Sequence, residues 1–151
     1  MSGNPDYRDL QRLIHRVTLL GDRVGERLFT ERVGVGRAMF LVLRTIGDAG
    51  DEGVTSQQWL AEELSLTKGA VSRHVATAAA HGWLTVGASP VSRREHALRL
   101  TAAGRDLLER GRALQLERER AADAELDAGD VAAAIRTLTI MGQMLEREDK
   151  Q

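Results

Sequence analysis

The sequence predicts a mainly α-helical fold with one small β-hairpin. Two patterns favour this fold: apolar residues recur at three- and four-residue spacing over most of the chain, and two short strand-like segments lie between residues 83 and 100. Of the 151 residues, 42% are hydrophobic and 28% are charged, so the chain can bury a core. Its length suits one compact domain, or one lobe plus a long appendage.

The composition excludes several classes of protein. The chain has no cysteine, which rules out disulfides, thiolate zinc ligands and thiol-based sensing of oxidants. Its four histidines lack metal-ligand spacing, and it has no Gly-rich phosphate loop or His–carboxylate zinc motif, so we expect no enzyme and no metal or cofactor site. Without a run of about 18 apolar residues or a secretory signal, the sequence indicates a cytoplasmic protein with no membrane partner.

An amphipathic helix is predicted over residues 5–29. Asn4 is a suitable N-cap, and Pro5 fits the first helical position because an N–H group would be unpaired there. One face of this helix carries Tyr7, Leu10, Ile14, Val17, Gly21, Val24 and Leu28. A more uniformly apolar helix follows over residues 37–46, and this composition is typical of a buried helix.

Two further helices are predicted at the other end of the chain. Thr101 is expected to cap a long helix that extends to about Leu126, and Asp127 and Asp130 begin the last one. The apolar stripes of the terminal helices lie far along the sequence from the central segment. They are therefore not expected to serve only as the core of that segment. We therefore predict that residues 5–30 and 101–148 are dimerisation helices that hold a homodimer together.

Two short helices with a tight turn between them are predicted in the centre of the chain. Thr55 and Gln58 form a capping box, so a helix is expected to begin at Ser56. Thr67 caps the next helix, and Gly82 ends it. The buried stripe of this second helix is expected to be Val71, Val75 and Ala78, and its outward face carries Lys68, Gly69, Ser72, Arg73, Ala76 and Thr77.

A β-hairpin with a basic tip is predicted after these helices. Residues 83–86 are apolar and partly β-branched, residues 96–100 alternate, and the turn-rich connection contains Arg93 and Arg94. The net charge of the whole chain is −1, yet residues 65–100 hold five basic residues and a single acidic one. Positive charge is therefore concentrated where the short helices and the hairpin lie, and phosphate binding depends on such local charge.

The order of two short helices, a turn and a basic hairpin is that of a winged helix-turn-helix. A helix fits the major groove of double-stranded DNA, where Arg73 can form two hydrogen bonds with a guanine edge. The first turn of the helix, with Thr67 and Lys68, can hold a phosphate, and the arginines of the wing suit the narrow minor groove. The candidate DNA-binding residues are Thr67, Lys68, Gly69, Ser72, Arg73, Thr77, Arg93 and Arg94.

The alternative is a winged helix that serves as a protein-interaction module without DNA. That function would need an apolar patch on the outward face of the second helix, where Lys68, Ser72, Arg73 and Thr77 stand instead. Any single basic residue here could equally be a solvated surface charge. The combination of capped helix pair, turn, hairpin and basic tip is what favours DNA binding.

Residues 59–75, WLAEELSLTKGAVSRHV, resemble the helix-turn-helix of the multiple-antibiotic-resistance regulator (MarR) family. Arg93 and Arg94 before the second strand are similar to the wing of that family. Residues 100–104, LTAAG, are similar to the start of its dimerisation helix.

The resemblance covers about residues 35–115. It implies a single MarR-like domain over residues 1–151, in which residues 35–100 form the winged helix-turn-helix lobe. It also implies a homodimer, a palindromic operator and repression that a small-molecule ligand relieves. The residues themselves do not separate repression from activation.

By the same resemblance, the ligand is expected to be small, partly apolar and anionic. The candidate ligand-binding residues are Phe29, Phe40, Trp59 and Arg118. The aromatic side chains either line a pocket between the dimerisation helices and the DNA-binding lobe or belong to the core. Arg118 falls on the apolar face of the long helix. Three roles are open for it: its side chain extends to solvent, forms an ion pair across the dimer, or holds an anionic ligand.

Overall fold

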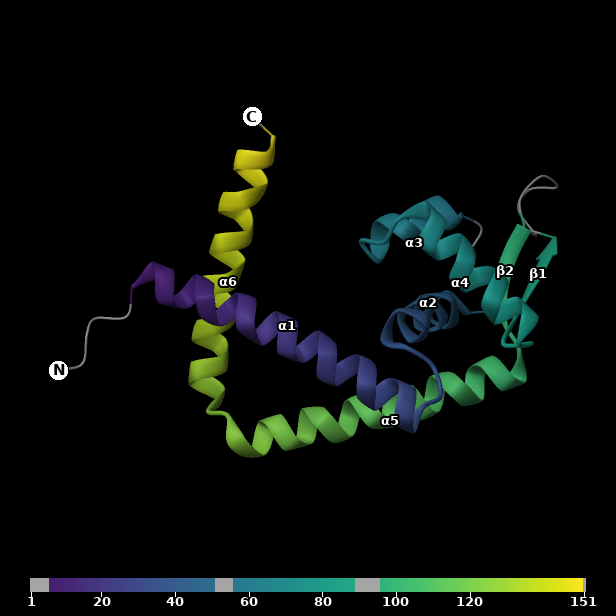
Figure 1. Cartoon of the computed structure of the whole chain (residues 1–151), viewed down its shortest axis with the longest axis horizontal. Coiled ribbons are helices and arrows are strands. Elements are labelled where there is room, and N and C mark those ends of the chain that lie inside the picture. The colour runs from purple at the N-terminus through teal and green to yellow at the C-terminus, as the bar shows by residue number, and fades with distance from the viewer. Residues whose placement is uncertain (1–5, 51–55, 89–95, 151) are drawn as a thin grey trace. The chain divides into compact units, whose positions relative to one another are not determined.

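The computed structural model describes residues 6–50, 56–88 and 96–150 (Figure 1). In chain order the elements are α1 (Tyr7–Arg32), α2 (Arg37–Asp48), α3 (Gln57–Glu63), α4 (Lys68–Ala80), β1 (Leu84–Ala88), β2 (His96–Leu100), α5 (Ala102–Glu125) and α6 (Ala128–Asp149). This is the mainly helical fold with a β-hairpin that the sequence predicted.

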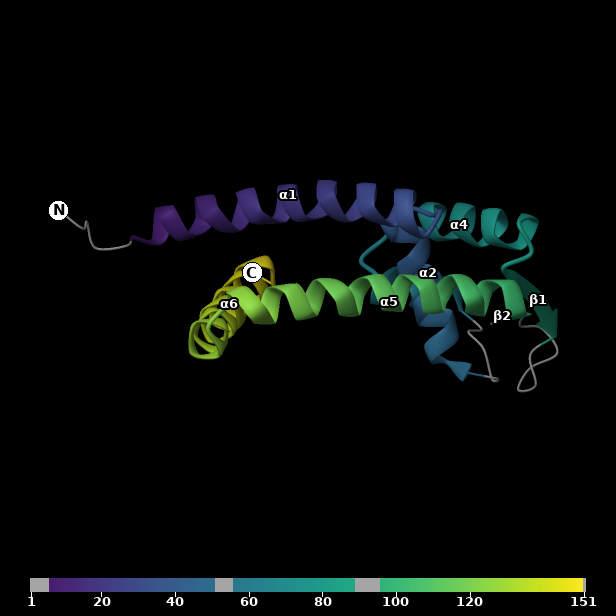
Figure 2. The ribbon, with the colours of Figure 1, turned by 90° about the horizontal axis from the view of Figure 1, so that it is seen from below.

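The chain divides into two compact units, Met1–Arg112 and Ala113–Gln151. The boundary lies within α5, which Figure 2 shows as one continuous helix. In the part of the chain that the structure describes, no helix is long and apolar enough to cross a membrane.

Helix α1 begins later and ends later than predicted. Its N-cap is Asp6, whose carboxylate accepts a hydrogen bond from the N–H group of Asp9 at 2.9 Å, whereas Asn4 and Pro5 lie outside the described residues. The helix ends three residues beyond the predicted limit, shortly before Gly34. Gly34 has a φ of +91°, a conformation that glycine adopts without steric cost and that turns the chain out of the helix.

Helix α2 lies at the centre of the first unit, where it contacts α1, α4 and β2. Its apolar composition correctly predicted a buried helix. The ring of Phe40 packs on that of Phe29 in α1, with centroids 4.6 Å apart. Helix α5 approaches the same ring through Gly111, where a side chain would collide with Phe40. The most deeply buried large side chains of the core are Phe40, Leu43, Ile46, Leu60, Val33, Val42 and Val71.

Strands β1 and β2 pair antiparallel, with Leu84 opposite Leu100. Strand β1 begins one residue later than predicted and continues to Ala88, inside the segment predicted as a loop. Trp83 stays outside the strand because its backbone N–H group donates to the carbonyl oxygen of Ala78 at 2.9 Å, which closes the end of α4. The strand therefore starts only after this helix-ending bond is complete.

Thr101 forms hydrogen bonds with the segment that follows α4 and with the start of α5. Its hydroxyl donates to the carbonyl oxygen of Gly82 at 2.6 Å and accepts a bond from the N–H group of Gly104 at 3.1 Å, so it caps α5 as predicted. Its own N–H group donates to the carbonyl oxygen of Trp83 at 3.0 Å. Gly104 lies so close to the backbone of Trp83 that a side chain at this position would collide with it.

Helix α6 begins where predicted: Asp127 is its N-cap, and its carboxylate accepts hydrogen bonds from the N–H groups of Gly129 and Asp130. In this helix no residue is buried, although every one of its residues is described. Its exposed large apolar residues are Val131, Ile135, Leu138, Ile140, Met144 and Leu145.

Candidate nucleic-acid interface

Helix α4 has one buried stripe and one exposed polar face. The stripe consists of Val71, Val75 and Ala78, as the helical spacing predicted. The exposed face, called the α4 face below, consists of Lys68, Gly69, Ser72, Arg73, Ala76 and Thr77. Its members follow one another at three- and four-residue spacing and therefore form a continuous polar strip about 15 Å long.

The first turn of α4 has an N-cap, Thr67, and free hydrogen-bond donors of the backbone. The hydroxyl of Thr67 accepts a hydrogen bond from the N–H group of Ala70 at 3.1 Å, as predicted, and its own proton remains available for a ligand. The first N–H groups of any helix have no intrahelical acceptor, and the helix dipole favours negative charge there. At Gly69 a Cβ would meet open space, so the backbone of this turn can be approached closely.

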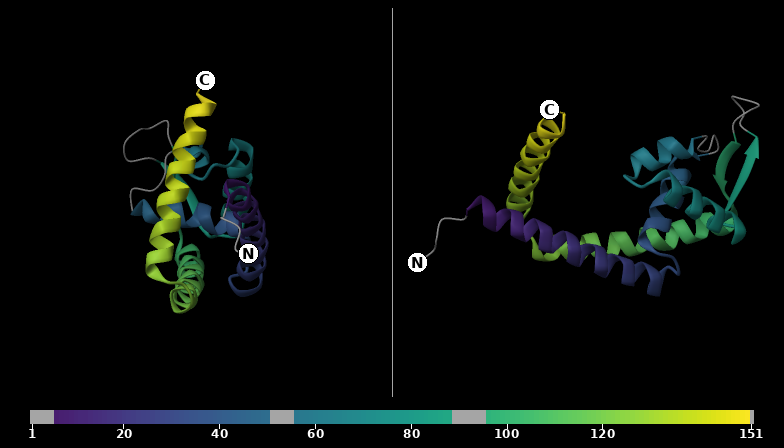
Figure 3. Two further views of the ribbon diagram at one scale, coloured as in Figure 1. Left: turned by 90° about the vertical axis from the view of Figure 1, so that its left-hand side faces the viewer. Right: turned by 45° about the horizontal axis from the view of Figure 1, so that its top comes forward.

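The turn between α3 and α4 fixes the direction in which the α4 face points. Ser65 has a φ of +51°, and the N–H group of Leu66 donates to the carbonyl oxygen of Ala61 at 2.9 Å. Leu60 and Ala61 of α3 are buried, as is the stripe of α4, and the two helices are in contact. The right-hand view of Figure 3 shows α3 and α4 together with the hairpin that follows them.

The start of α3 corrects one prediction. The N-cap is Ser56, whose hydroxyl accepts from the N–H group of Trp59 at 3.1 Å. The sequence placed the cap one residue earlier, at Thr55, which lies outside the described residues. Both residues carry a β-hydroxyl suited to capping, so the pattern alone identified the turn but not the capping residue.

The predicted wing contacts cannot be placed in the same way. Arg93 and Arg94 lie outside the described residues, between β1 and β2. The described part of the hairpin ends with Ala88 opposite His96. Of the eight predicted DNA-binding residues, the structure thus brings six together on α4 and its cap, and the role of all eight stays a prediction.

The four predicted ligand-binding residues do not share one environment. Phe29 and Phe40 pack against each other in the core, which agrees with the packing alternative. The alternative that Trp59 belongs to the core is wrong, because its side chain is 46% exposed. Helix α3 buries Leu60 and Ala61 instead. Arg118 is exposed on α5, in the second unit. A ligand site formed by these residues stays a prediction.

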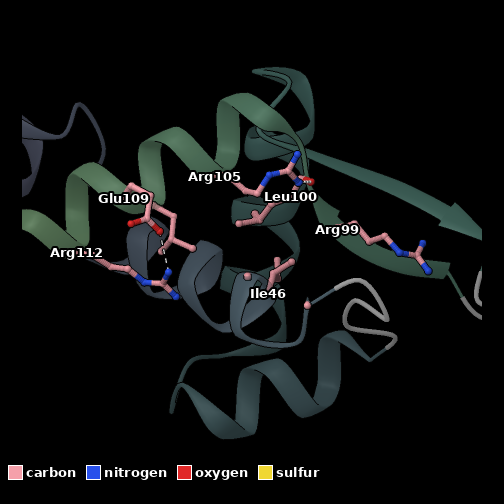
Figure 4. A pocket seen from close by; sticks show the side chains of 9 residues that line it. Ile46, Arg99, Leu100, Arg105, Glu109 and Arg112 are labelled. Atoms are coloured by element: carbon pink, nitrogen blue, oxygen red, sulfur yellow. Dashed lines mark hydrogen bonds and ion pairs between the residues drawn. The ribbon is translucent and has the colours of Figure 1, made fainter.

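Two cavities in the first unit were not predicted from the sequence. One, of about 430 Å³, is lined by residues of α1, α2 and α4 that include Glu26, His74 and Thr77, and by His81, which follows α4. The other, of about 320 Å³, lies between the end of α2, strand β2 and the start of α5, and three arginines line it (Figure 4). The spacing of Arg105 and Arg112, two turns apart on one helix, was the only sequence signal for the second cavity.

The fold is that of a winged-helix protein, and α4 presents an exposed face of charged, hydroxyl-bearing and small residues. Residues 33–95 match the model of the MarR family. A comparison of the sequence with curated proteins found no match. The segment that contains α2, α3, α4 and β1 is therefore similar in sequence to the MarR family.

The chain is similar to several solved structures. Wild-type MarR from E. coli, in its apo form, is 26% identical, with 87% of this chain and 96% of that chain covered and a TM-score of 0.66. FabT from Streptococcus pneumoniae in complex with DNA is 20% identical, with 94% and 99% covered and a TM-score of 0.77. Sco3205 from Streptomyces coelicolor in complex with DNA is 17% identical, with 95% and 93% covered and a TM-score of 0.78.

Proposed function

We propose that this protein is a sequence-specific DNA-binding regulator that binds a palindromic operator as a homodimer. The α4 face carries the proposal, because it combines charge, hydrogen-bonding groups and small residues on a helix whose opposite side is fixed in the core. Structural relatives in complex with DNA, FabT and Sco3205, support the same function. An apolar partner protein would find no matching patch on this face.

Each part of the α4 face has a distinct role in the proposal. Arg73, one turn after the start of the helix, contacts a base edge with its planar guanidinium group. Thr67 and Lys68 hold a backbone phosphate at the positive end of the helix dipole. Gly69 and Ser72 let the helix enter the major groove without steric conflict, and Arg93 and Arg94 add contacts from the wing.

Unburied apolar residues support the homodimer. Helix α6 is 22 residues long and buries none of them, although an isolated helix of this length gains little stability without packing of its apolar face. The first half of α1 also exposes apolar side chains, among them Leu13, Val17 and Leu19. Contiguous exposed apolar surface of this kind marks an interface, and a second copy of the chain supplies matching surface.

We further propose that the dimer represses transcription and that a small, partly apolar anion releases it from DNA. The match of residues 33–95 to the MarR family model supports this regulatory part of the proposal. Selection of bound duplexes from a random pool tests the DNA-binding part directly. We expect enrichment of sites with dyad symmetry and half-sites about one helical turn, or 10 base pairs, apart. Failure to enrich any sequence, or enrichment of single half-sites only, would contradict it.

A further inference from the structure

Lysine is rare in this chain, and one of its lysines lies on the α4 face. The sequence has 21 basic residues, of which only Lys68 and Lys150 are lysines and all others are arginines. The difference is chemical, because a guanidinium group keeps its charge, whereas the amine of lysine can be acylated and then carries no charge. In residues 33–95, Lys68 is therefore the one cation whose charge an acyl group can remove.

The amine of Lys68 is accessible and has no bonding partner. Lys68 is the first residue of α4, and its side chain is exposed. Among the described residues, none forms a hydrogen bond or an ion pair with this amine. The neighbouring Gly69 has no side chain, and a Cβ at this position would meet open space. An acyl donor therefore reaches the amine without displacing a neighbouring side chain.

The charge around Lys68 attracts an acyl donor that carries phosphate. Residues 65–100 hold five basic residues and one acidic residue, and a basic surface raises the local concentration of anions. The first turn of α4 adds N–H groups without intrahelical acceptors, of which the hydroxyl of Thr67 binds that of Ala70 at 3.1 Å. Acyl phosphates and acyl-CoA are both activated acyl groups on a phosphate-bearing carrier. Both are therefore drawn to this end of α4.

Lys150 has the opposite electrostatic surroundings. It is the C-cap of α6, at the negative end of that helix dipole. Of the four residues before it, Glu146, Glu148 and Asp149 are acidic and one is basic. This surface repels an anionic donor. The two lysines thus offer the same reactive group in fields of opposite sign, which makes Lys150 an internal control for Lys68.

We propose that Lys68 is an acylation site, at which an acyl phosphate or an acyl-CoA transfers its acyl group to the amine. The neutral amine attacks the acyl carbon and forms a C–N amide bond, while the C–O bond to phosphate or the C–S bond to coenzyme A breaks. Phosphate or the coenzyme A thiolate leaves with the electron pair of that bond, and the nitrogen loses one proton to solvent. The product is a neutral amide, so Arg73 remains as the only cation of the α4 face.

The lost charge acts on DNA binding and not on the fold. A cation at the N-terminus of a helix gains nothing from the helix dipole, so its removal does not weaken α4. The amide that replaces it stays in solvent, because Lys68 is exposed. Each acylated chain loses one phosphate contact, which should reduce the salt slope of DNA binding by about one unit per protomer. Only this consequence rests on the proposed function, whereas the acylation itself does not.

Incubation of the DNA-free full chain with acetyl phosphate in one series and acetyl-CoA in another tests the proposal. Mass spectrometry of the peptides measures the acetylation rate of each lysine. We expect Lys68 to react at least about tenfold faster than Lys150, because the surrounding charge attracts the donor. Added salt should reduce this preference, since it screens exposed charges. A reaction with only one of the two compounds identifies the donor.

The acetylated protein is then titrated with its selected duplex. Acetylation of Lys68 should weaken binding about tenfold, because a hydrogen bond between charged groups is lost. Each variant is compared with its own untreated form. Treatment of Lys68→Arg should leave the DNA affinity of that variant where it was before treatment, and Lys150→Arg should respond to treatment as the wild type does.

Several results would overturn the proposal. Lys150 that reacts as fast as Lys68 at low salt, or no acetylation of Lys68 by millimolar donor, would refute the site. An equal loss of DNA affinity in treated Lys68→Arg would assign the effect to another group, and an acetylated protein with unchanged affinity would refute the effect on DNA. A protein that is acetylated at Lys68 but binds no duplex before treatment would contradict the proposed function and not this site.

Discussion

Helices α4 and α6 are both capped at the N-terminus by a short oxygen-bearing side chain, and both carry apolar residues at helical spacing. Yet α4 buries its stripe in the core of the first unit, whereas α6, nearly twice as long, buries nothing. Local sequence therefore forms both helices, but only one of them finds its packing partner within a single chain. In the proposed homodimer, α6 buries its apolar residues against a second copy of the chain.

The largest effect is expected for a substitution of Leu138, which lies in α6. Leu138→Asp places a charge in the apolar stripe of α6, and an uncompensated buried charge costs about 3–5 kcal/mol. We expect the dimer to dissociate at micromolar concentration, or the chain to unfold, as measured by sedimentation and circular dichroism. The control Gln143→Asp lies on the opposite side of α6 by helical spacing and should sediment like the wild type. A wild-type chain that sediments as a stable monomer would refute the dimer itself.

The second prediction concerns packing in the first unit, at Gly111. Gly111→Ala drives a methyl group into the ring of Phe40, and overpacking of this kind costs about 1–3 kcal/mol. Gly69→Ala meets open space on α4 and should stabilise the helix by up to about 1 kcal/mol. Urea unfolding measures both variants. An unchanged or higher unfolding midpoint for Gly111→Ala would show that α5 does not approach α2 this closely.

The third prediction compares the α4 face with the wing. Losing Arg73 should weaken operator binding by about 1–3 kcal/mol and relax preference at one position in each half-site. Losing Arg94 should weaken binding to all sequences more evenly and reduce the salt slope by about one unit per protomer. Binding of Arg73→Ala and Arg94→Ala to matched and mismatched duplexes across a salt series distinguishes a loss of base preference from a loss of sequence-independent affinity. Changes of only a few tenths of a kcal/mol in both would refute the proposed contacts.

The smallest effect is expected at Thr101. Thr101→Val removes the hydroxyl that caps α5 and bonds the carbonyl oxygen of Gly82, which should lower the free energy of unfolding by about 0.5–2 kcal/mol. Thr101→Ser keeps the hydroxyl and should restore most of this loss. Thermal unfolding, followed by circular dichroism, measures the change in the free energy of unfolding of both variants. Equal stability of the valine and wild-type proteins would mean that the segment joining α4 and α5 does not depend on this side chain.

The sequence by itself determined the order and type of the elements. Caps such as Thr67, Thr101 and Asp127 act on backbone groups within three residues, so their effect can be read from neighbouring positions. The stripe of α4 was equally readable, because burial at three- and four-residue spacing follows from helix geometry.

Only the tertiary structure decided which of those apolar residues are buried and where cavities form. Trp59 and Leu138 are large and apolar, yet both are exposed in the single chain, because burial depends on which element lies opposite and not on the side chain alone. The rim of the cavity unites Arg99 of β2 with Arg105 and Arg112 of α5, and its floor includes Ile46 of α2. These residues are separated by up to 66 positions, and no local pattern records a contact between segments so far apart in the chain.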